Sequence, residues 1–267
     1  IGAGYNSSDG TVATFNVNER NFLGKGQTIK LDLSSSKIEK QIALGFEDPS
    51  FLGRNLFAGI SFGQTTTTPS STPLNTDKLY FAPKVGFPLS RDSNLSIEYS
   101  FDQEDVKLTT SNTVSPLITK DVGKKSKSGL IFTYNIDKTN SVVTPTAGYD
   151  FRIIQELNGL GGDISYSKSD LNFKTYRTIL RDDIILSSNL SSGVILGSDA
   201  SLMNRFTLGG DRLKGFRNLG IGPYDSTYDT HLGGKMYTSL SLEASFPIGI
   251  PEEYGIYGGV FLDTGSL

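Results

Sequence analysis

The sequence predicts an all-β fold, a transmembrane antiparallel up-and-down β-barrel formed by a single domain over residues 1–267. Three observations predict it: apolar and polar residues alternate with a period of two from end to end, helical stripes with caps are nearly absent, and short turns alternate with longer polar connections. No run approaches eighteen apolar residues, so a transmembrane helix is excluded. A barrel strand turns only alternate residues toward lipid, so the slightly negative mean hydropathy is compatible with a membrane.

The first predicted strand, Ile1–Asn6, is short and rich in glycine. Later strands show one apolar and one wet face, as in the run from Leu95 to Asp102, where Leu, Ile, Tyr and Phe alternate with Ser, Glu, Ser and Asp. The segments 56–63 and 239–246 alternate in the same way. We therefore expect Glu98, Asp102, Glu243 and Asp263 to face the lumen, and Leu95, Ile97, Leu240, Leu242, Val260 and Leu262 to face lipid.

The connections fall into two classes. Gly, Pro, Asn and Asp mark short turns at 21–26, 48–55, 90–94 and 247–254. Longer polar connections are expected at 63–76, 102–127 and 196–231, and the Thr, Ser and Pro run at 65–72 is expected to be a solvated loop. This division gives about thirteen strands, the last at 254–264. Bacterial single-chain barrels close with an even number of strands, so we expect more strands after residue 267.

Composition excludes several classes of function. The chain has no cysteine and one histidine, His231, so it offers no basis for a disulfide framework or a Cys/His metal site. A net charge of -3 gives no basic surface for nucleic acid. We expect neither a catalytic residue nor a cofactor site, because no nucleophile motif accompanies the histidine. The chain begins directly in a strand-like run with no signal peptide and no initiating Met, which predicts a mature fragment or an excised piece of a longer protein.

The segment 206–223 is the longest irregular stretch that is not of low complexity. It is punctuated by glycine and carries three basic residues, Arg212, Lys214 and Arg217, beside one large aromatic residue, Phe216. Read from the residues alone, it is a solvated outer loop.

This segment nevertheless resembles the sixth outer loop of the BamA family, which carries a Val-Arg-Gly-Phe tetrad preceded by two glycines. Gly209-Gly210 and Leu213-Lys214-Gly215-Phe216 occupy those places, and Ile-Gly-Pro follows at 221–223. Other similar segments lie in the same order along the whole chain: 21–24, 48–51, 145–148 and 261–265. The resemblance implies a sixteen-stranded barrel and a loop, residues 196–231, that folds into the lumen.

In one respect the tetrad departs from the family. The family's arginine reaches acidic groups of the barrel wall, whereas Lys214 offers a point charge without the planar fork of arginine. Glu243 and Asp263 match the acidic positions of the family, and Arg212 or Arg217 could share the pairing. Lumen faces are generally polar, so the alternative is that these carboxylates have no special partner.

The resemblance also gives the first strand a role. In the family, the first and last strands form a weak lateral seam, and a client strand adds to the exposed edge. Gly2, Ala3, Gly4 and Tyr5 would form this seam strand, since glycine weakens a strand. Simple fraying at a chain end is the alternative.

The implied function is the insertion and folding of β-barrel proteins in the bacterial outer membrane, without a cofactor and without enzymatic activity. The implied partners are membrane lipid, unfolded β-barrel clients, and periplasmic or lipoprotein subunits that bind domains absent from this chain. Within the same superfamily, the rivals are a secretion pore and an autotransporter-assembly paralogue. From other classes, the rivals are a passive diffusion porin and an outer-membrane enzyme.

Overall fold

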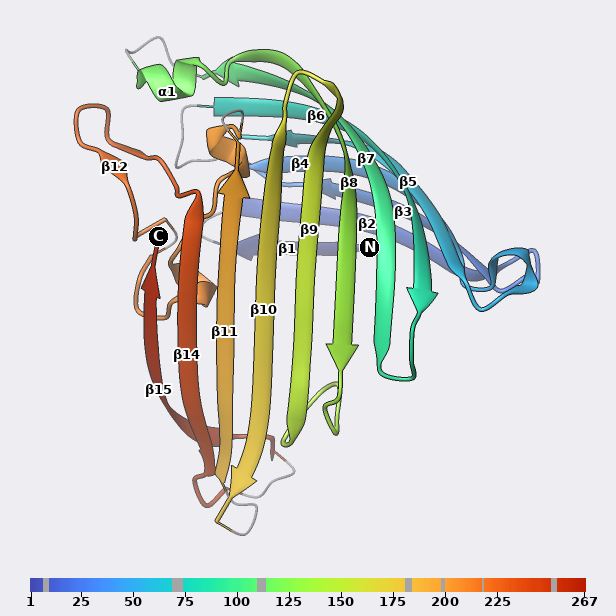
Figure 1. Ribbon diagram of the computed structural model, residues 1–267, viewed down its shortest axis with the longest axis vertical. Helices are drawn as coiled ribbons and strands as arrows, with labels where there is room; N and C mark the ends of the chain where they lie inside the picture. The colour runs from blue at the N-terminus through green and yellow to red at the C-terminus, as the bar shows by residue number, and fades with distance from the viewer. Residues whose placement is uncertain are drawn as a thin grey trace.

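A single curved antiparallel sheet of thirteen strands dominates the structure (Figure 1). The computed structural model describes residues 1–6, 10–68, 74–109, 114–180, 184–197, 200–217, 219–250 and 254–267. In sheet order, the strands are β1 (Gly2–Asn6), β2 (Gly10–Phe22), β3 (Gln27–Ser35), β4 (Glu39–Asp48), β5 (Phe57–Thr67), β6 (Leu74–Pro88), β7 (Ser93–Leu108), β8 (Gly123–Asp137), β9 (Gly148–Gly162), β10 (Tyr166–Ile179), β11 (Ile184–Leu196), β14 (Met236–Pro247) and β15 (Tyr257–Ser266). The predicted fold class and the predicted thirteen strands are confirmed.

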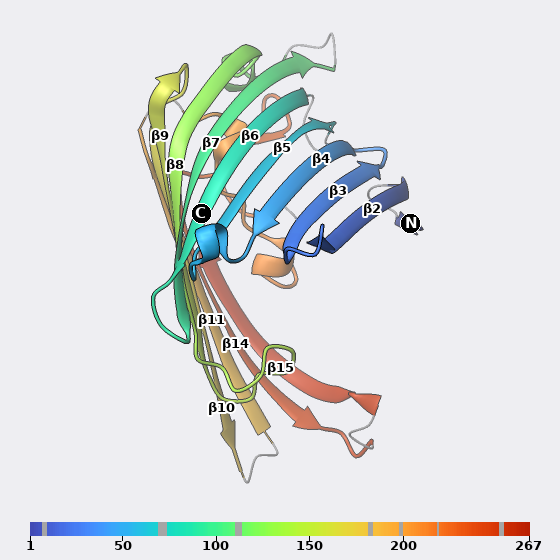
Figure 2. The ribbon, with the colours of Figure 1, turned by 90° about the vertical axis from the view of Figure 1, so that its right-hand side faces the viewer.

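The sheet bends into an open trough, and the segment between β11 and β14 lies on its concave side (Figure 2). Each strand pairs with the strand before and after it in this order, so β1 and β15 are the two edges. Among the described residues, these two edge strands do not pair with each other. No helix in the described parts of the chain is long and apolar enough to cross a membrane.

Two of the expected long connections are shorter than the sequence suggested. β5 continues to Thr67 and β6 begins at Leu74, so most of the expected loop 63–76 is strand; residues 69–72 of the Thr, Ser and Pro run lie outside the described residues. Similarly, β7 continues to Leu108 and β8 begins at Gly123. The expectation was wrong because it treated polar residues as loop. Here they extend the hydrogen-bonded ladder, as in the pairing of Asp77 with Asp105.

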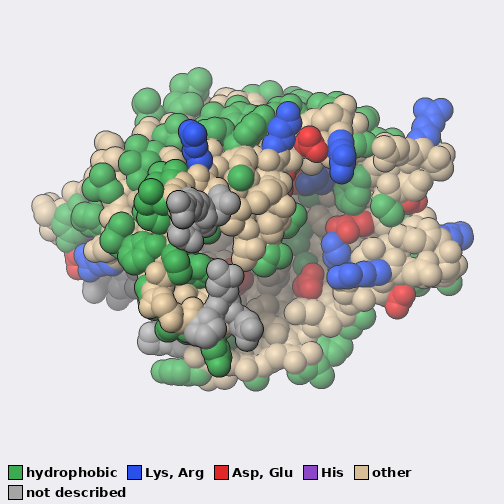
Figure 3. Space-filling view, turned by 90° about the horizontal axis from the view of Figure 1, so that it is seen from below, with side chains coloured by type: hydrophobic (Ala, Val, Ile, Leu, Met, Phe, Trp, Pro, Cys, Tyr) green, Lys and Arg blue, Asp and Glu red, His purple; other side chains and the backbone are tan. Residues whose placement is uncertain are grey.

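The two faces of the sheet differ in chemistry, as period 2 requires. Large apolar side chains are exposed on the convex face, including Phe62, Leu242 and Leu262. The concave face carries glycine, serine and charged residues, and its hollow has acidic and basic side chains around it (Figure 3). The register places Glu98, Asp102, Glu243 and Asp263 together on this face, opposite to the leucines at 240, 242 and 262.

The long connections pack against one another at one end of the sheet. A short helix, α1 (Pro116–Thr119), follows β7, and its Ile118 is buried with Leu74 and Val106. Between β11 and β14, the chain forms a small hairpin of β12 (Tyr224–Asp225) and β13 (Thr230–His231). Ser115 Oγ donates to Asp225 Oδ2 at 3.0 Å and so joins the two connections.

Candidate functional site

The candidate site is the connection between β11 and β14, which lies against the concave face. Its residues Phe206, Leu208 and Leu213 are buried, and they form one apolar cluster with side chains of the strands. The other buried members of this cluster are Ile164, Tyr166, Ile195, Ala200 and Tyr237. The long connection therefore forms a core on the concave side of the trough.

Glycines shape the local path of this connection. Gly209 has a φ of 128°, which disfavours a side chain, and a Cβ there would collide with the carbonyl oxygen of Arg217. The N–H of Gly210 donates to the carbonyl oxygen of Phe216 at 2.8 Å, which closes a tight turn around the tetrad. Gly215, at the tip of this turn, also has a positive φ of 85°. Lys214 is thus presented at the tip of a turn whose conformation the glycines allow.

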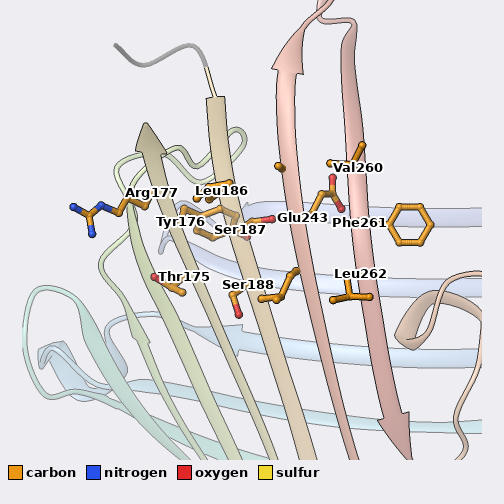
Figure 4. A pocket seen from close by; sticks show the side chains of 12 residues that line it. Thr175, Tyr176, Arg177, Leu186, Ser187, Ser188, Glu243, Val260, Phe261 and Leu262 are labelled. Atoms are coloured by element: carbon orange, nitrogen blue, oxygen red, sulfur yellow. The ribbon is translucent and has the colours of Figure 1, made fainter. Parts of the chain in front are cut away.

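The turn brings Lys214 to both predicted acidic residues. Lys214 Nζ lies 2.5 Å from Glu243 Oε2, and the backbone N–H of Lys214 donates to Asp263 Oδ2 at 2.8 Å. The other oxygen of Asp263 accepts a hydrogen bond from Ser241 Oγ at 2.6 Å, which orients the carboxylate. The ammonium group also lies 4.6 Å from the ring centroid of Phe261. Figure 4 shows Glu243 and Phe261 on the neighbouring strands β14 and β15, where they are register partners.

The exposed fractions of the Lys214 and Glu243 side chains limit how much their ion pair can stabilise the position of the loop. The side chains of Lys214 and Glu243 are 40% and 37% exposed, so water screens the pair. Exposed ion pairs contribute roughly 0 to 1 kcal/mol. Burial of a single leucine or phenylalanine side chain contributes about 1.5–3 kcal/mol, and the connection buries three such side chains. The apolar cluster therefore holds the loop in place, and the lysine contacts orient its tip.

The two auxiliary basic residues have other neighbours. The guanidinium carbon of Arg212 lies 4.9 Å from the ring centroid of Tyr237, within the range of a cation–π interaction. Arg217 contributes its backbone, because its carbonyl oxygen accepts a hydrogen bond from the N–H of Gly220 at 2.8 Å. Among the described residues, neither side chain forms an ion pair with Glu243 or Asp263.

The sequence interpretation missed the aromatic support of the loop. The ring of Tyr237 lies 4.7 Å from that of Phe206, and its hydroxyl donates to Asp170 Oδ1 at 3.1 Å. Gly193 lies beneath both rings. The inward position of Tyr237 follows from the alternation on β14, but its neighbours Asp170 and Gly193 come from β10 and β11 and depend on the register.

A second missed feature is a buried charge cluster on the same face. Lys127 Nζ lies 3.1 Å from Asp102 Oδ2 and 3.2 Å from Glu156 Oε1, with side-chain exposures of 9%, 3% and 16%. Tyr166 and Asn158 donate to the same Glu156 oxygen at 2.9 and 2.8 Å. Because Tyr166 belongs to the apolar cluster, the charge cluster is adjacent to the core of the loop.

The predicted seam residues lie on the edge strand β1. Gly2, Ala3, Gly4 and Tyr5 pair with β2 on one side only. By register, Gly2 and Gly4 lie on the concave face with Thr14, and Tyr5 is 79% exposed. The strand spans five residues, so its contribution to the sheet is small.

In the part of the chain that the structure describes, no group of three or more His, Asp or Glu side chains is placed to hold a metal ion. His231 packs beside Tyr224 in the small hairpin, with the ring centroids 5.0 Å apart.

Comparison with known proteins fits this architecture. Residues 21–267 match the family described as the Omp85 superfamily domain. The outer membrane protein assembly factor BamA of Neorickettsia risticii is 23% identical over the whole chain, which covers 36% of that protein. The sorting and assembly machinery component 50 homologue of Mus musculus is 28% identical to this chain. The match covers 92% of this chain and 54% of the mouse protein. The chain thus spans between about a third and a half of these relatives.

A solved structure shows the same fold. The crystal structure of BamA from Haemophilus ducreyi lacking POTRA domains 1–3 superposes with a TM-score of 0.84. The match covers 99% of this chain and 56% of that one, at 19% sequence identity.

Proposed function

The chain belongs to the Omp85 superfamily, and from this premise we propose that it is the barrel region of a factor that inserts and folds β-barrel proteins in the bacterial outer membrane. The observation that carries the proposal is the contact of Lys214 with Glu243 and Asp263 on the concave face. A passive diffusion porin keeps a water-filled channel, whereas here a packed loop fills part of the concavity. BamA and sorting and assembly machinery proteins are among its relatives.

The proposed mechanism uses the edge strand β1 as a template. A membrane-inserted chain must satisfy all its backbone hydrogen bonds internally, so an incoming strand needs a partner strand while it enters lipid. Within this chain β1 pairs with β2, and its other edge would present N–H and C=O groups to a client when the seam opens. A short strand rich in glycine gives up a partner at low energetic cost.

The loop would support this process from inside. The tip residue Lys214 contacts β14 and β15, the two strands at the opposite edge of the trough. By holding these strands in register, the loop would stabilise the wall of the trough that lies opposite β1. Partner subunits and soluble client segments would bind the parts of the protein that lie outside this chain.

Site-specific crosslinking tests the template role. Cysteine at Ala3, in the full-length protein, should form a disulfide with a cysteine in the terminal strand of a client stalled during insertion. Cysteine at Ile97 is the matched control, because β7 pairs on both sides and has no free edge. Equal crosslinking from both positions, or none from Ala3, would contradict the proposal.

A further inference from the structure

Three short turns at one end of the sheet repeat one sequence pattern, a leucine followed by a small residue and then a basic residue. The pattern reads Leu23-Gly24-Lys25 between β2 and β3, Leu52-Gly53-Arg54 between β4 and β5, and Leu89-Ser90-Arg91 between β6 and β7. The first two turns lie at the right-hand end of the sheet in Figure 1. The exposed fractions of the three leucines are 74%, 78% and 58%. Successive hairpins therefore present three leucines and three cations along one stretch of the rim.

Two of these leucines have a backbone conformation that residues with a side chain rarely adopt. The φ angle is 55° at Leu23 and 57° at Leu52, in the left-handed region, where glycine and asparagine are the usual residues. The turns do not bury either side chain. Packing within the turn therefore does not explain a leucine at these positions, which points to an apolar environment outside the described residues.

Strand β6 shows where the hydrocarbon zone of the membrane ends. Its alternate residues on the convex face are apolar from Leu79 to Phe87, and Leu89 continues the series in the turn. The segment 79–89 has the length of a transmembrane β-strand, which needs about 9–11 residues. Beyond Leu79 the same face becomes charged, since the next outward residue, Asp77, pairs with Asp105. Leu89 thus lies at the edge of the hydrocarbon zone, and the basic residue that follows it lies at headgroup level.

The three cations are available for an external partner. Among the described residues, none of them takes part in an ion pair. The carboxylates of Glu19 and Asp48, beside the first two turns, accept hydrogen bonds from backbone N–H groups of these turns. An exposed apolar side chain beside a free cation is complementary to the surface of an anionic membrane, because the apolar group enters the headgroup region and the cation binds phosphate.

We propose that these three turns form a contact surface for anionic phospholipid in the leaflet at the short-turn end of the barrel. The leucines enter the headgroup region, and Lys25, Arg54 and Arg91 bind lipid phosphates. The occupant is lipid because the apolar convex face of β6 continues without interruption into Leu89, so the rim extends the surface that faces the membrane. This contact requires only that the sheet is a membrane-embedded barrel, and it is independent of the proposed insertion activity.

Tryptophan fluorescence tests the position of the leucines. The chain contains no tryptophan, so Leu23→Trp or Leu52→Trp supplies one reporter in the full-length protein once any other tryptophan is replaced by phenylalanine. In vesicles of phosphatidylglycerol brominated on the upper part of its acyl chains, each reporter should lose most of its fluorescence. Leu117→Trp is the control, because Leu117 is also exposed, at 43%, but lies in α1 at the opposite end of the sheet.

Two outcomes of this experiment would overturn the proposal. Turn reporters that acrylamide quenches from water as readily as it quenches Leu117→Trp would show that the leucines stay outside the membrane. Turn reporters protected from both acrylamide and brominated lipid would show that a protein domain covers them.

Replacement of the cations tests the headgroup contact. Electron paramagnetic resonance with spin-labelled phosphatidylglycerol and phosphatidylcholine measures which lipid the full-length protein retains beside it in vesicles of the two lipids. The wild-type protein should prefer phosphatidylglycerol, and the triple variant Lys25→Gln, Arg54→Gln, Arg91→Gln should lower this preference at least about two-fold. The matched triple variant is Lys120→Gln, Arg152→Gln, Lys174→Gln.

This matched variant removes the same charge away from the short-turn rim. Arg152 and Lys174 lie on the concave face, in register rows that lead to Ser239 and Ser241, and Lys120 follows α1. It should keep the wild-type lipid preference. Equal retention of the two lipids by the wild-type protein, or an equal loss of preference in both triple variants, would overturn the proposal. Heat-modifiable migration in gels confirms that each variant is folded before its lipids are measured.

Discussion

Phe206 packs its ring against the backbone of Gly193, with no room for a side chain between them. A Cβ at Gly193 would collide with the tip of the Phe206 ring and would lie 2.6 Å from Cε1 of Tyr237. The loop thus rests directly on strand β11, and this close approach requires glycine.

Gly193→Ala should therefore displace the loop while the sheet stays folded. Overpacking of this kind costs about 1–3 kcal/mol, and here the cost falls on the loop because Phe206 is the side chain that can move. Limited proteolysis of the connection between β11 and β14 should become several-fold faster. Gly45→Ala is the control, because its Cβ would meet only Lys30 Cβ at an ordinary 3.7 Å. Equal protection of the two variants would refute the proposed packing role of Gly193.

Lys214→Ala should loosen the loop tip and impair client insertion, with little loss of global stability. The exposure of the Lys214–Glu243 pair limits its contribution to roughly 1 kcal/mol. Glu243→Gln should act in the same direction but more weakly, since the glutamine carbonyl can still accept a hydrogen bond from the Lys214 ammonium, which also keeps its contact with the Phe261 ring. Lys214→Arg should be tolerated, because arginine adds the planar fork.

The pair Lys30–Glu47 provides a control for this series. Its N···O distance is 2.6 Å and its side chains are 37% and 34% exposed, which closely matches the Lys214 pair, but it joins β3 to β4 and does not involve the connection between β11 and β14. Lys30→Ala should leave insertion unchanged. Protease protection and an insertion assay would be measured for all variants. If Lys214→Ala were silent in both assays, the role of this contact in the loop would be rejected.

Much of the architecture could be predicted because period 2 assigns every strand residue to a face. That rule alone turned Glu243 and Asp263 toward the concavity, where the structure places Lys214. The same rule could not locate the ends of β6 and β7. Near residues 74–78 and 102–107 both faces of these strands carry polar side chains, so the apolar–polar alternation stops although the backbone hydrogen bonds between the strands continue. Contacts among three strands, such as Tyr237 with Asp170, depend on register and inter-strand geometry that one sequence does not specify.

Lys127→Met should destabilise the barrel much more than the loss of an exposed pair. It would leave Asp102 and Glu156 without their shared cation in a site where all three side chains are at most 16% exposed. Breaking a buried pair in this way costs about 3–5 kcal/mol. Lys84→Met is the control, since the Lys84 and Glu98 side chains are 39% and 28% exposed. Urea unfolding of protein in lipid vesicles would measure both, and a Lys127→Met loss no larger than that of Lys84→Met would show that the cluster is hydrated.

Leu242→Arg tests the assignment of the convex face to lipid. Leu242 is 42% exposed and lies near the middle of β14, so its substituent would enter the hydrocarbon region. An arginine near the bilayer midplane costs roughly 2–4 kcal/mol. Ser187→Arg is the matched change on the opposite face, where Ser187 pairs with Glu243 and an arginine would meet water and a carboxylate. We expect Leu242→Arg to lower the urea midpoint of unfolding in lipid vesicles clearly and Ser187→Arg to leave it nearly unchanged.

In detergent micelles, which deform around a charge, the difference in urea midpoint between the two variants should shrink. If both substitutions were equally tolerated in vesicles, Leu242 would not face hydrocarbon. The assignment of the convex face to lipid would then be wrong for the whole sheet, because the strand register places Leu242 on the same face as Leu240 and Leu262.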